Sequence, residues 1–478
     1  MLEPRFDRGF FIIMINAVAT APTRNTEQLH VGSTPAASAL FDFLSAVFTA
    51  LDQAAINYAL LRGYEELQDA QNHIEVDLLV APEDLPRLAG VVARENFVAL
   101  PNWGHAPHHF FLGFDRHSGG WLKLDVVTEL RYGAPARVLR VDLAETCLQG
   151  RERRAPTYVL APEHEFFTLL LHCLLDKKKI REERRARLQD LFEALHHSNE
   201  ARARCEALLT KFLTPALTWG DLQNIFANGD WQALLKRHNA VAARLHKGQR
   251  FAVWKRSIHG KLLRRLRPLF FAMRQRGLFI ALLAPDGAGK STLAQALKKD
   301  FGVKAQLIYM GTNIAALNVS LPTTKWLHRL LKKSRAPKAL KLALKPVNYL
   351  NRICDLWYRI AYAHVQRLRG KFVVFDRYVY DSWIAKPANT WAKRMRRKFL
   401  EAGWPAPHLV ILLDAPGELL FRRKGEHSPE WLEQQRQAYL ALQKHVPQMR
   451  AINAMQAAEE VRREVIALVW EKYKKKNH

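Results

Sequence analysis

The chain has 478 residues, of which 49% are hydrophobic and 25% are charged; these values exclude a disordered or fibrous protein and indicate globular domains. One hydrophobic core rarely serves more than about 300 residues, so two or three domains are expected. The formal net charge of +28 divides into −1 for residues 1–250 and +29 for residues 251–478. The basic half favours an anionic partner (a nucleotide, nucleic acid, an anionic membrane surface or a phosphorylated sugar) over a purely solubilising surface.

The first 35 residues are expected to be a flexible lead. Residues 9–21 are apolar enough to pass for a short signal sequence, but the flank before them is barely cationic. We therefore discount the segment and consider Met14 an alternative start of translation. The four cysteines lie far apart without metal-ligand spacing, and no apolar run is long enough to span a membrane. A cytoplasmic protein is expected.

Residues 36–150 are predicted to form a small α/β domain. Apolar residues at helical spacing predict helices over 39–54 and 82–95. Short stretches rich in β-branched and aromatic residues predict strands between and after them. These strands are expected at 58–61, 74–80, 108–114 and 121–127.

Residues 151–276 are predicted to be a helical domain that ends in a basic connector. Helices are expected at 163–175, 182–197, 201–212, 219–226 and 231–246. The segment 255–276 is strongly basic and contains no acidic residue. It could be an amphipathic helix at a membrane surface, but the favoured interpretation is a charged connector that packs on its neighbours.

Residues 277–478 are predicted to be a second α/β domain with a parallel sheet. Strands are expected at 278–283, 306–309, 372–375 and 409–413, with helices between them. These runs are continuously apolar, which indicates strands that are buried on both faces under layers of helices.

The most specific signal lies directly after the first of these strands. Residues 284–292 read A-P-D-G-A-G-K-S-T, which has the spacing of a phosphate-binding P-loop between a strand and a helix. Its backbone N–H groups would surround a phosphate at a helix N-terminus, Lys290 would reach the β- and γ-phosphates, and Ser291 would bind Mg²⁺. The predicted ATP-binding residues are Ala284, Pro285, Asp286, Gly287, Ala288, Gly289, Lys290, Ser291 and Thr292.

Two later features have the chemistry that phosphoryl transfer needs. Asp376 follows an apolar strand and could hold Mg²⁺ or orient the acceptor, and Arg377 could grip an acceptor phosphate. A mobile loop with Arg422, Arg423 and Lys424 could close over the γ-phosphate as a basic lid. We predict catalytic roles for Lys290, Asp376, Arg377, Arg422 and Arg423, and Mg²⁺ ligation by Ser291 and Asp376.

The residues 285–292, 373–378, 409–418 and 422–426 resemble, in this order, motifs of the thymidylate kinase family. The resemblance covers roughly 277–470 and implies an ATP- and Mg²⁺-dependent kinase whose arginine finger comes from the lid. The chain departs from the family at 307–312, which has no arginine where the family carries Arg-Glu-Pro-Gly-Gly, and a basic insert follows at 325–345. The acceptor pocket is therefore expected to differ, and thymidine monophosphate is not the expected substrate.

A second group of carboxylates lies in the N-terminal half. Glu75 and Asp77 alternate on one predicted strand and so face the same way, and Asp125 lies on another. Together they could hold Mg²⁺. With Arg62-Gly63-Tyr64 before them, they are similar to the nucleotidyltransferase (polymerase-β-like) superfamily, although its usual Gly-Ser is absent. An inactive domain is the alternative.

The leading hypothesis is a Mg²⁺/ATP-dependent phosphotransferase for an anionic acceptor such as a nucleotide, a phosphosugar or a glycolipid precursor. The combination of the two resemblances suggests a role in surface-polysaccharide metabolism. Two alternatives stay open: a nucleic-acid end-processing kinase and nucleotidyltransferase, whose affinity would depend steeply on salt, and a non-catalytic ATP-binding regulator.

Overall fold

The computed structural model describes residues 35–67, 73–133, 137–274, 277–311, 313–332, 338–384 and 404–477. The expected flexible lead lies outside these residues, except for its last position. Within the described ranges no helix is long and apolar enough to cross a membrane.

The N-terminal half contains a mixed sheet of seven strands. Their order is β3 (Phe97–Leu100), β4 (His108–Phe114), β5 (Trp121–Val127), β2 (His73–Val80), β1 (Tyr58–Leu60), β9 (Thr157–Val159) and β8 (Glu152–Arg154). The four strands expected from the sequence are confirmed, whereas β3, β8 and β9 were not predicted. Strand β9 pairs in parallel with β1, so this sheet continues past residue 150, where we had placed the end of the domain.

Two helices cover one face of this sheet. Helices α1 (Pro35–Gln53) and α2 (Leu85–Arg94) share a core with one face, to which Phe48, Tyr58 and Leu124 contribute. The expected helix over 82–95 begins as a 3-10 turn, η2 (Pro82–Asp84). The remaining elements of this half are η1 (Glu65–Leu67), the two-stranded sheet of β6 (Leu130–Tyr132) and β7 (Leu139–Val141), and α3 (Ala144–Gln149).

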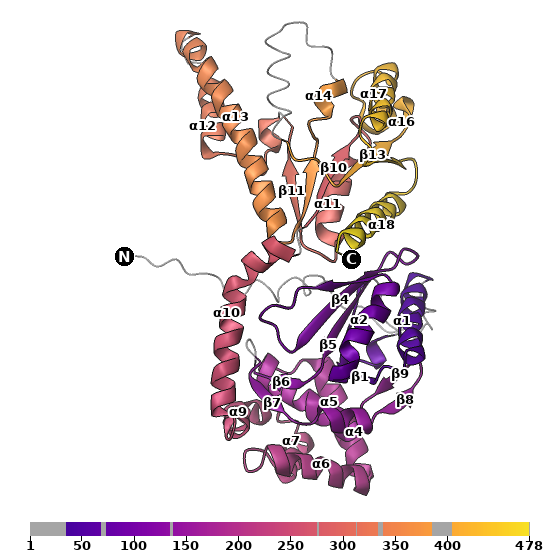
Figure 1. Ribbon diagram of the computed structural model, residues 1–478, viewed down its shortest axis with the longest axis vertical. Coiled ribbons are helices and arrows are strands. Elements are labelled where there is room, and N and C mark those ends of the chain that lie inside the picture. Colours follow the sequence, from indigo (N-terminus) through magenta and orange to yellow (C-terminus); the bar gives the residue numbers. More distant parts are fainter. Residues whose placement is uncertain are drawn as a thin grey trace. The chain divides into compact units, whose positions relative to one another are not determined.

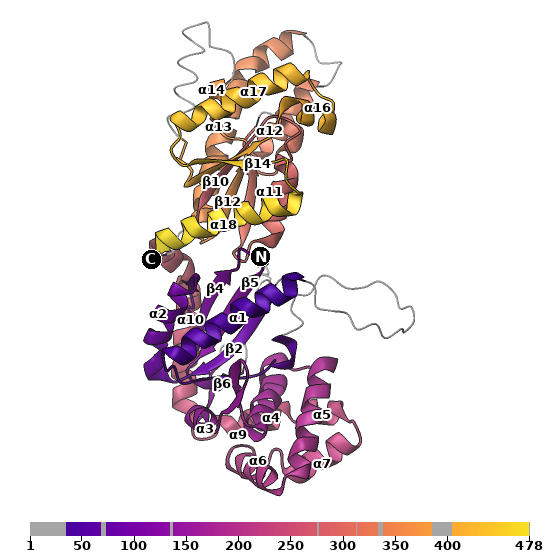
Figure 2. The same cartoon turned by 90° about the vertical axis from the view of Figure 1, so that its right-hand side faces the viewer.

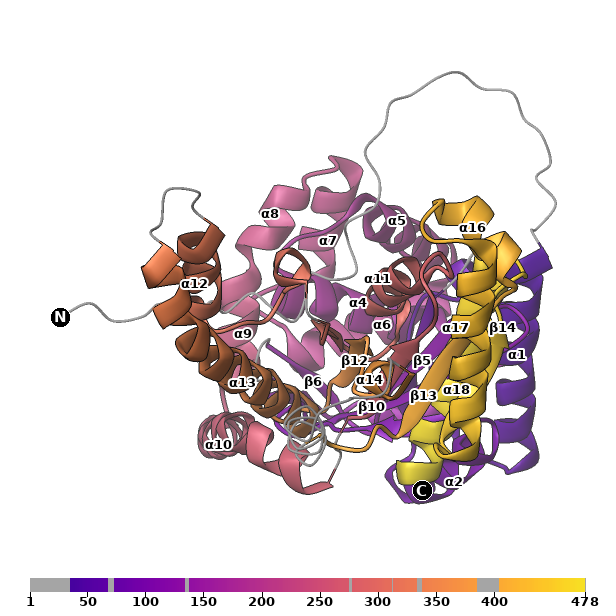
Figure 3. The same ribbon diagram turned by 90° about the horizontal axis from the view of Figure 1, so that it is seen from above.

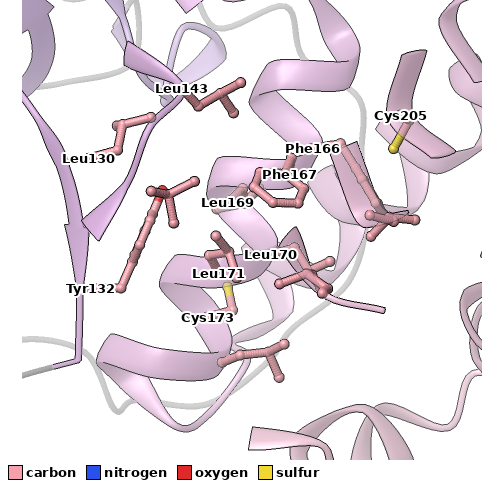
Figure 4. Packing of buried hydrophobic residues seen from close by; sticks show 14 of the residues in the cluster. Leu130, Tyr132, Leu143, Phe166, Phe167, Leu169, Leu170, Leu171, Cys173 and Cys205 are labelled. Atoms are coloured by element: carbon pink, nitrogen blue, oxygen red, sulfur yellow. The ribbon is translucent and has the colours of Figure 1, made fainter. Parts of the chain in front are cut away.

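The predicted helical region is present and has its own apolar core, part of which Figure 4 shows around Phe166, Phe167 and Leu170. Its elements are α4 (Pro162–Leu171), the π-helix η3 (His172–Lys177), α5 (Glu182–His197), α6 (Asn199–Phe212), α7 (Trp219–Ala227), α8 (Trp231–Lys236), α9 (His238–His246) and α10 (Arg250–Arg274). The single helix expected at 231–246 is wrong. It divides at Arg237, whose N–H bonds to Leu234 in a tighter turn and whose side chain pairs with Asp221.

The C-terminal half contains a parallel sheet of five strands (Figure 1). Their order is β11 (Ala305–Tyr309), β12 (Phe372–Asp376), β10 (Phe279–Leu283), β13 (Leu409–Asp414) and β14 (Met449–Asn453). The four expected strands are confirmed. Strand β14 was not predicted because it lies at the edge and alternates buried with exposed residues instead of forming an apolar run.

Alternate residues of β10 enter two different cores. Ile280 and Leu282 pack with α11 (Lys290–Asp300) and α18 (Ala458–Asn477), which lie side by side in Figure 2. Phe279 and Ala281 pack with α13 (Lys338–Leu368) and α17 (Pro429–Ala441) on the opposite face. The result is the three-layer arrangement that the apolar strands predicted.

Shorter elements complete the C-terminal half. They are η4 (Ile314–Ala316), α12 (Pro322–Lys332), α14 (Asp381–Ile384), α16 (Gly417–Lys424) and η5 (Leu442–Lys444). The described parts of the basic insert expected at 325–345 lie in α12 and in the N-terminal half of α13, whereas residues 333–337 lie outside the described ranges. The two helices lie side by side in Figure 3. Because all five strands run in parallel, β10, β12 and β13 end at one edge of the sheet, which positions the candidate site.

Candidate active site

The P-loop connects the buried strand β10 to helix α11, as the sequence predicted. Gly287 and Gly289 have φ angles of 89° and 88°, in the left-handed region that only glycine adopts without strain. Gly287 also lies against α16, because a Cβ there would come within 2.6 Å of the Leu420 carbonyl oxygen. Ser291 and Thr292 are exposed in the first turn of α11, where free backbone N–H groups and the helix dipole favour an anion.

Lys290 is buried in the loop it follows. Its Nζ donates to the carbonyl oxygens of Ala284 at 2.6 Å and Pro285 at 3.0 Å. Burial and the neighbouring guanidinium of Arg377 lower the pKa of Lys290 to about 8, although Asp286 and other carboxylates oppose this shift. A buried lysine whose protonated form is destabilised in this way is suited to binding phosphate, because the phosphate would stabilise the protonated form.

Arg377 follows directly after β12 and faces the P-loop. Its φ of 68° is unusual for a residue with a side chain, and such backbone strain is concentrated at functional sites. Its Nη2 donates to Asp286 Oδ1 at 2.8 Å, and its Nη1 lies 3.8 Å from Asp381 Oδ2. Burial alone would raise the pKa of Asp286, but Lys290, Arg377 and Lys424 hold it below its usual value.

Two carboxylates complete this cluster. Burial raises the pKa of Asp376, while Lys290 and Arg377 oppose the shift. Burial also raises the pKa of Asp381, which accepts a hydrogen bond from the Tyr439 hydroxyl at 2.8 Å. The cluster therefore places two cations and three carboxylates at a phosphate-binding loop, which is the composition that phosphoryl transfer requires.

The predicted lid arginines lie on α16 but do not point to the P-loop. Arg422 is 72% exposed and pairs with Glu418 at 2.5 Å, and Arg423 donates to the Ala454 carbonyl oxygen at 3.0 Å. Lys424, at the end of the same helix, interacts electrostatically with Asp286. In this conformation Lys424 is the basic residue of the expected lid whose charge acts on the P-loop, although the sequence analysis assigned it no catalytic role.

Comparison with known proteins agrees with this geometry. The family model described as thymidylate kinase matches residues 285–465. The probable thymidylate kinase of Pyrococcus abyssi is 31% identical over 223 residues, which cover 41% of this chain and 96% of that protein. The chain belongs to the thymidylate kinase family. Its match to this family lies in the C-terminal half and makes the chain an ATP-dependent kinase.

Further similarities cover the same part of the chain. The probable thymidylate kinase of Pyrococcus horikoshii is 28% identical over 211 residues, which cover 41% of this chain and 96% of that protein. The solved structure of the thymidylate kinase from Candida albicans is 20% identical and covers 42% of this chain and 94% of that chain, with a TM-score of 0.31.

Within the thymidylate kinase part, the structure brings together Lys290, Asp376 and Arg377 from the predicted catalytic set and leaves Arg422 and Arg423 apart. Asp381 was not predicted from the sequence, because no spacing rule marks a residue that follows Asp-Arg-Tyr. No role was predicted for Tyr439 either. The signal that could have found both is a buried polar pair, which becomes visible only when α17 packs over α14.

A second cluster of metal-ligand type lies at the same site. Ligand atoms of Asp286, Glu426 and His427 all fall within 4.8 Å of one another. Two of the three already have cationic partners, Arg377 for Asp286 and Lys424 for Glu426. Because these cations already compensate the two carboxylates, the cluster does not require a metal ion.

The three acidic residues predicted in the N-terminal half come together outside the family match. Asp77 on β2 and Asp125 on β5 are direct neighbours in a parallel register. Ligand atoms of both residues and of Glu75 lie within 4.8 Å of one another, a spacing at which they could share a divalent cation. Each carboxylate also has a partner within the chain. Asp77 pairs with Arg62 at 2.6 Å, Asp125 with His108 at 2.5 Å and Glu75 with Lys123 at 2.5 Å.

Proposed function

We propose that the C-terminal half transfers the γ-phosphoryl group of Mg·ATP to the phosphate of a small acceptor, with a nucleoside monophosphate as the first candidate and phosphosugars and glycolipid precursors next. The observation that supports this most is the position of Arg377 at the end of β12, beside both Lys290 and the P-loop carboxylate Asp286. A guanidinium there can hold an acceptor phosphate close to the γ-phosphate with two parallel hydrogen bonds.

ATP would supply the phosphoryl group, and Mg²⁺ would neutralise part of the charge on the phosphates. The α11 N-terminus and Lys290 would hold the phosphates, and Ser291 with Asp376 would hold the metal ion. Asp376 and Asp381 would orient the acceptor. These roles fit the residues because α11 leaves N–H donors free and the pKa of the buried Lys290 is lowered. The relatives are named for thymidylate, but residues 307–311 provide no arginine for such a substrate.

The test is acceptor-dependent release of ADP by the full chain, measured against nucleoside monophosphates, phosphosugars and short oligonucleotides with a 5′-hydroxyl. Lys290→Ala should abolish turnover. Lys298→Ala removes an exposed lysine from the same helix and should leave turnover unchanged. ATP binding without turnover on any acceptor would refute the proposal in favour of a regulatory protein. Turnover on oligonucleotides alone would favour the end-processing enzyme.

For the N-terminal half we propose a nucleotidyltransferase-like domain whose carboxylates Glu75, Asp77 and Asp125 bind a divalent cation. The division into residues 36–150, 151–276 and 277–478 belongs to the same proposal, with the first boundary moved to residue 159 so that β8 and β9 stay with their sheet. Support comes from the parallel register of Asp77 and Asp125. A pocket beside them is lined by Arg62, Arg131, Arg137, His108 and His172 and by Glu129 and Asp176. Its three arginines could pair with a phosphate group.

Mn²⁺ binding measured by electron paramagnetic resonance tests this second proposal. A Lys290→Ala background reduces binding of Mn·ATP at the kinase site. In that background Asp77→Asn and Asp125→Asn should each weaken Mn²⁺ binding at least tenfold. Asp142→Asn changes an exposed carboxylate outside the cluster and is the matched control. Equal binding by all variants would indicate that the internal cations Arg62, His108 and Lys123 have replaced the metal.

A further inference from the structure

Helix α10 presents an unusual distribution of side chains. Its polar residues contact the N-terminal half: Arg256 donates to the Val138 carbonyl oxygen at 2.9 Å, and Arg267 Nη1 lies 2.9 Å from His105 Nε2. Two apolar residues lie on this face as well: Val253 is buried, and the ring of Phe270 packs against Trp103 with centroids 5.2 Å apart. The helix is thus held along much of its length by arginines that face the protein.

The opposite face of α10 is apolar and exposed. Phe251 is 74% exposed, Trp254 60% and Leu269 57%. The other members of this face are Ile258, Leu262 and Leu266, which are 38% to 52% exposed. At 3.6 residues per turn the six side chains occupy an arc of about 120°. A soluble helix normally buries such a stripe, and single exposed apolar residues do not produce one.

The charges around this stripe all have one sign. Helix α10 contains eight Lys and Arg residues and no Asp or Glu. Lys255, Lys261 and Arg265 are exposed and lie within or beside the apolar arc. Basic residues that flank an arc of Phe, Trp, Ile and Leu are the pattern of helices that lie in the plane of a membrane interface.

We propose that α10 docks the exposed face, defined by Phe251, Trp254, Ile258, Leu262, Leu266 and Leu269, onto an anionic lipid bilayer. Aromatic and aliphatic side chains would enter the boundary between headgroups and acyl chains, and the flanking cations would contact lipid phosphates. A second copy of the chain is a poorer occupant, because two such helices would bring like charges together. Nucleic acid is poorer too, because it offers no apolar surface for Ile and Leu.

The test is flotation of the full chain with vesicles of phosphatidylcholine, with and without phosphatidylglycerol. The wild-type chain should float with the anionic vesicles, and added salt should weaken the binding without abolishing it. The variant Trp254→Gln, Ile258→Gln, Leu262→Gln should lose at least about tenfold in partitioning, because three apolar side chains no longer enter the lipid. Glutamine keeps helix propensity, and these positions are exposed, so folding and ATP binding should be unchanged.

A matched control changes as many exposed apolar residues elsewhere. Trp326→Gln, Val347→Gln, Leu350→Gln alters side chains of 61%, 50% and 61% exposure on α12 and α13, and it should float like the wild-type chain. A charge variant, Lys255→Gln, Lys261→Gln, Arg265→Gln, should lose binding mainly at low salt. Equal flotation of the control and the α10 variant would overturn the proposal. A wild-type chain that does not bind the anionic vesicles would overturn it too. So would a wild-type chain that forms a dimer through this face, shown by a monomeric α10 variant.

Discussion

The lowered pKa of Lys290 makes ATP binding depend on pH in a range where few other groups titrate. With a pKa of about 8, Lys290 is about nine-tenths charged at pH 7 and about one-tenth charged at pH 9. Phosphate oxygens around Nζ would favour the charged form and raise the pKa. Binding therefore takes up a proton above pH 8, and the affinity for ATP should fall about tenfold between pH 7 and pH 9.

The charged groups that face Lys290 are Arg377, Asp286, Asp381 and Asp376. The arginine stays protonated from pH 7 to pH 9 and adds a constant field, whereas burial raises the pKa values of Asp376 and Asp381. Isothermal titration calorimetry with Mg·ATP at several pH values, in buffers of different ionisation enthalpy, would report both the affinity and the proton uptake.

Lys290→Arg is the control for this experiment. An arginine remains charged throughout the range, so the variant should bind ATP more weakly at pH 7 but with a nearly flat pH profile. A flat profile in the wild-type chain, or an equally steep one in the arginine variant, would refute the assignment of the slope to Lys290.

Three other outcomes follow from the same geometry. Gly289→Ala should destabilise the chain by about 1–2 kcal/mol in urea unfolding, through its left-handed φ alone. Gly287→Ala should cost about 1–3 kcal/mol more, because its Cβ meets the Leu420 carbonyl oxygen. Equal losses of unfolding free energy in the two variants would mean that α16 moves freely. Arg377→Ala should raise the KM for the acceptor at least tenfold with a smaller effect on ATP affinity, and equal losses of both would argue against acceptor binding. Burial, helped by nearby Arg62, lowers the pKa of His172 to about 3. The folded chain should therefore lose about 2 kcal/mol of stability as pH falls from 6.5 to 5, because His172 is protonated only in the unfolded chain. In His172→Gln the free energy of unfolding should fall less steeply with pH.

The P-loop, Asp376 and Arg377 were predictable from sequence because topology alone places them. Once apolar runs predict a parallel sheet, the carboxyl ends of its strands must share an edge, and residues that follow two adjacent strands must meet there. Strands β10 and β12 are direct neighbours in the sheet. Knowledge of side-chain contacts was not needed for this part of the site.

The lid could not be predicted in the same way, because a helix exposes its residues to every direction. Arg422 lies four residues after Glu418, a spacing at which side chains of a helix pair with each other. Arg423 points to Ala454 at the end of β14, a strand that was itself not predicted. The pattern of basic residues predicts a lid in this segment, but it cannot say which of these residues faces the P-loop.

The ionic contacts of Asp286 suggest how the three parts of the site depend on one another. This carboxylate pairs with Arg377 after β12 and interacts with Lys290 on α11 and Lys424 on α16. A phosphate that binds Arg377 must compete with Asp286 for the same guanidinium. The freed carboxylate would then interact more strongly with Lys290 and Lys424, and the lid would be drawn toward the P-loop. Acceptor and lid are therefore expected to be coupled through a residue of the ATP-binding loop, without a separate signalling element.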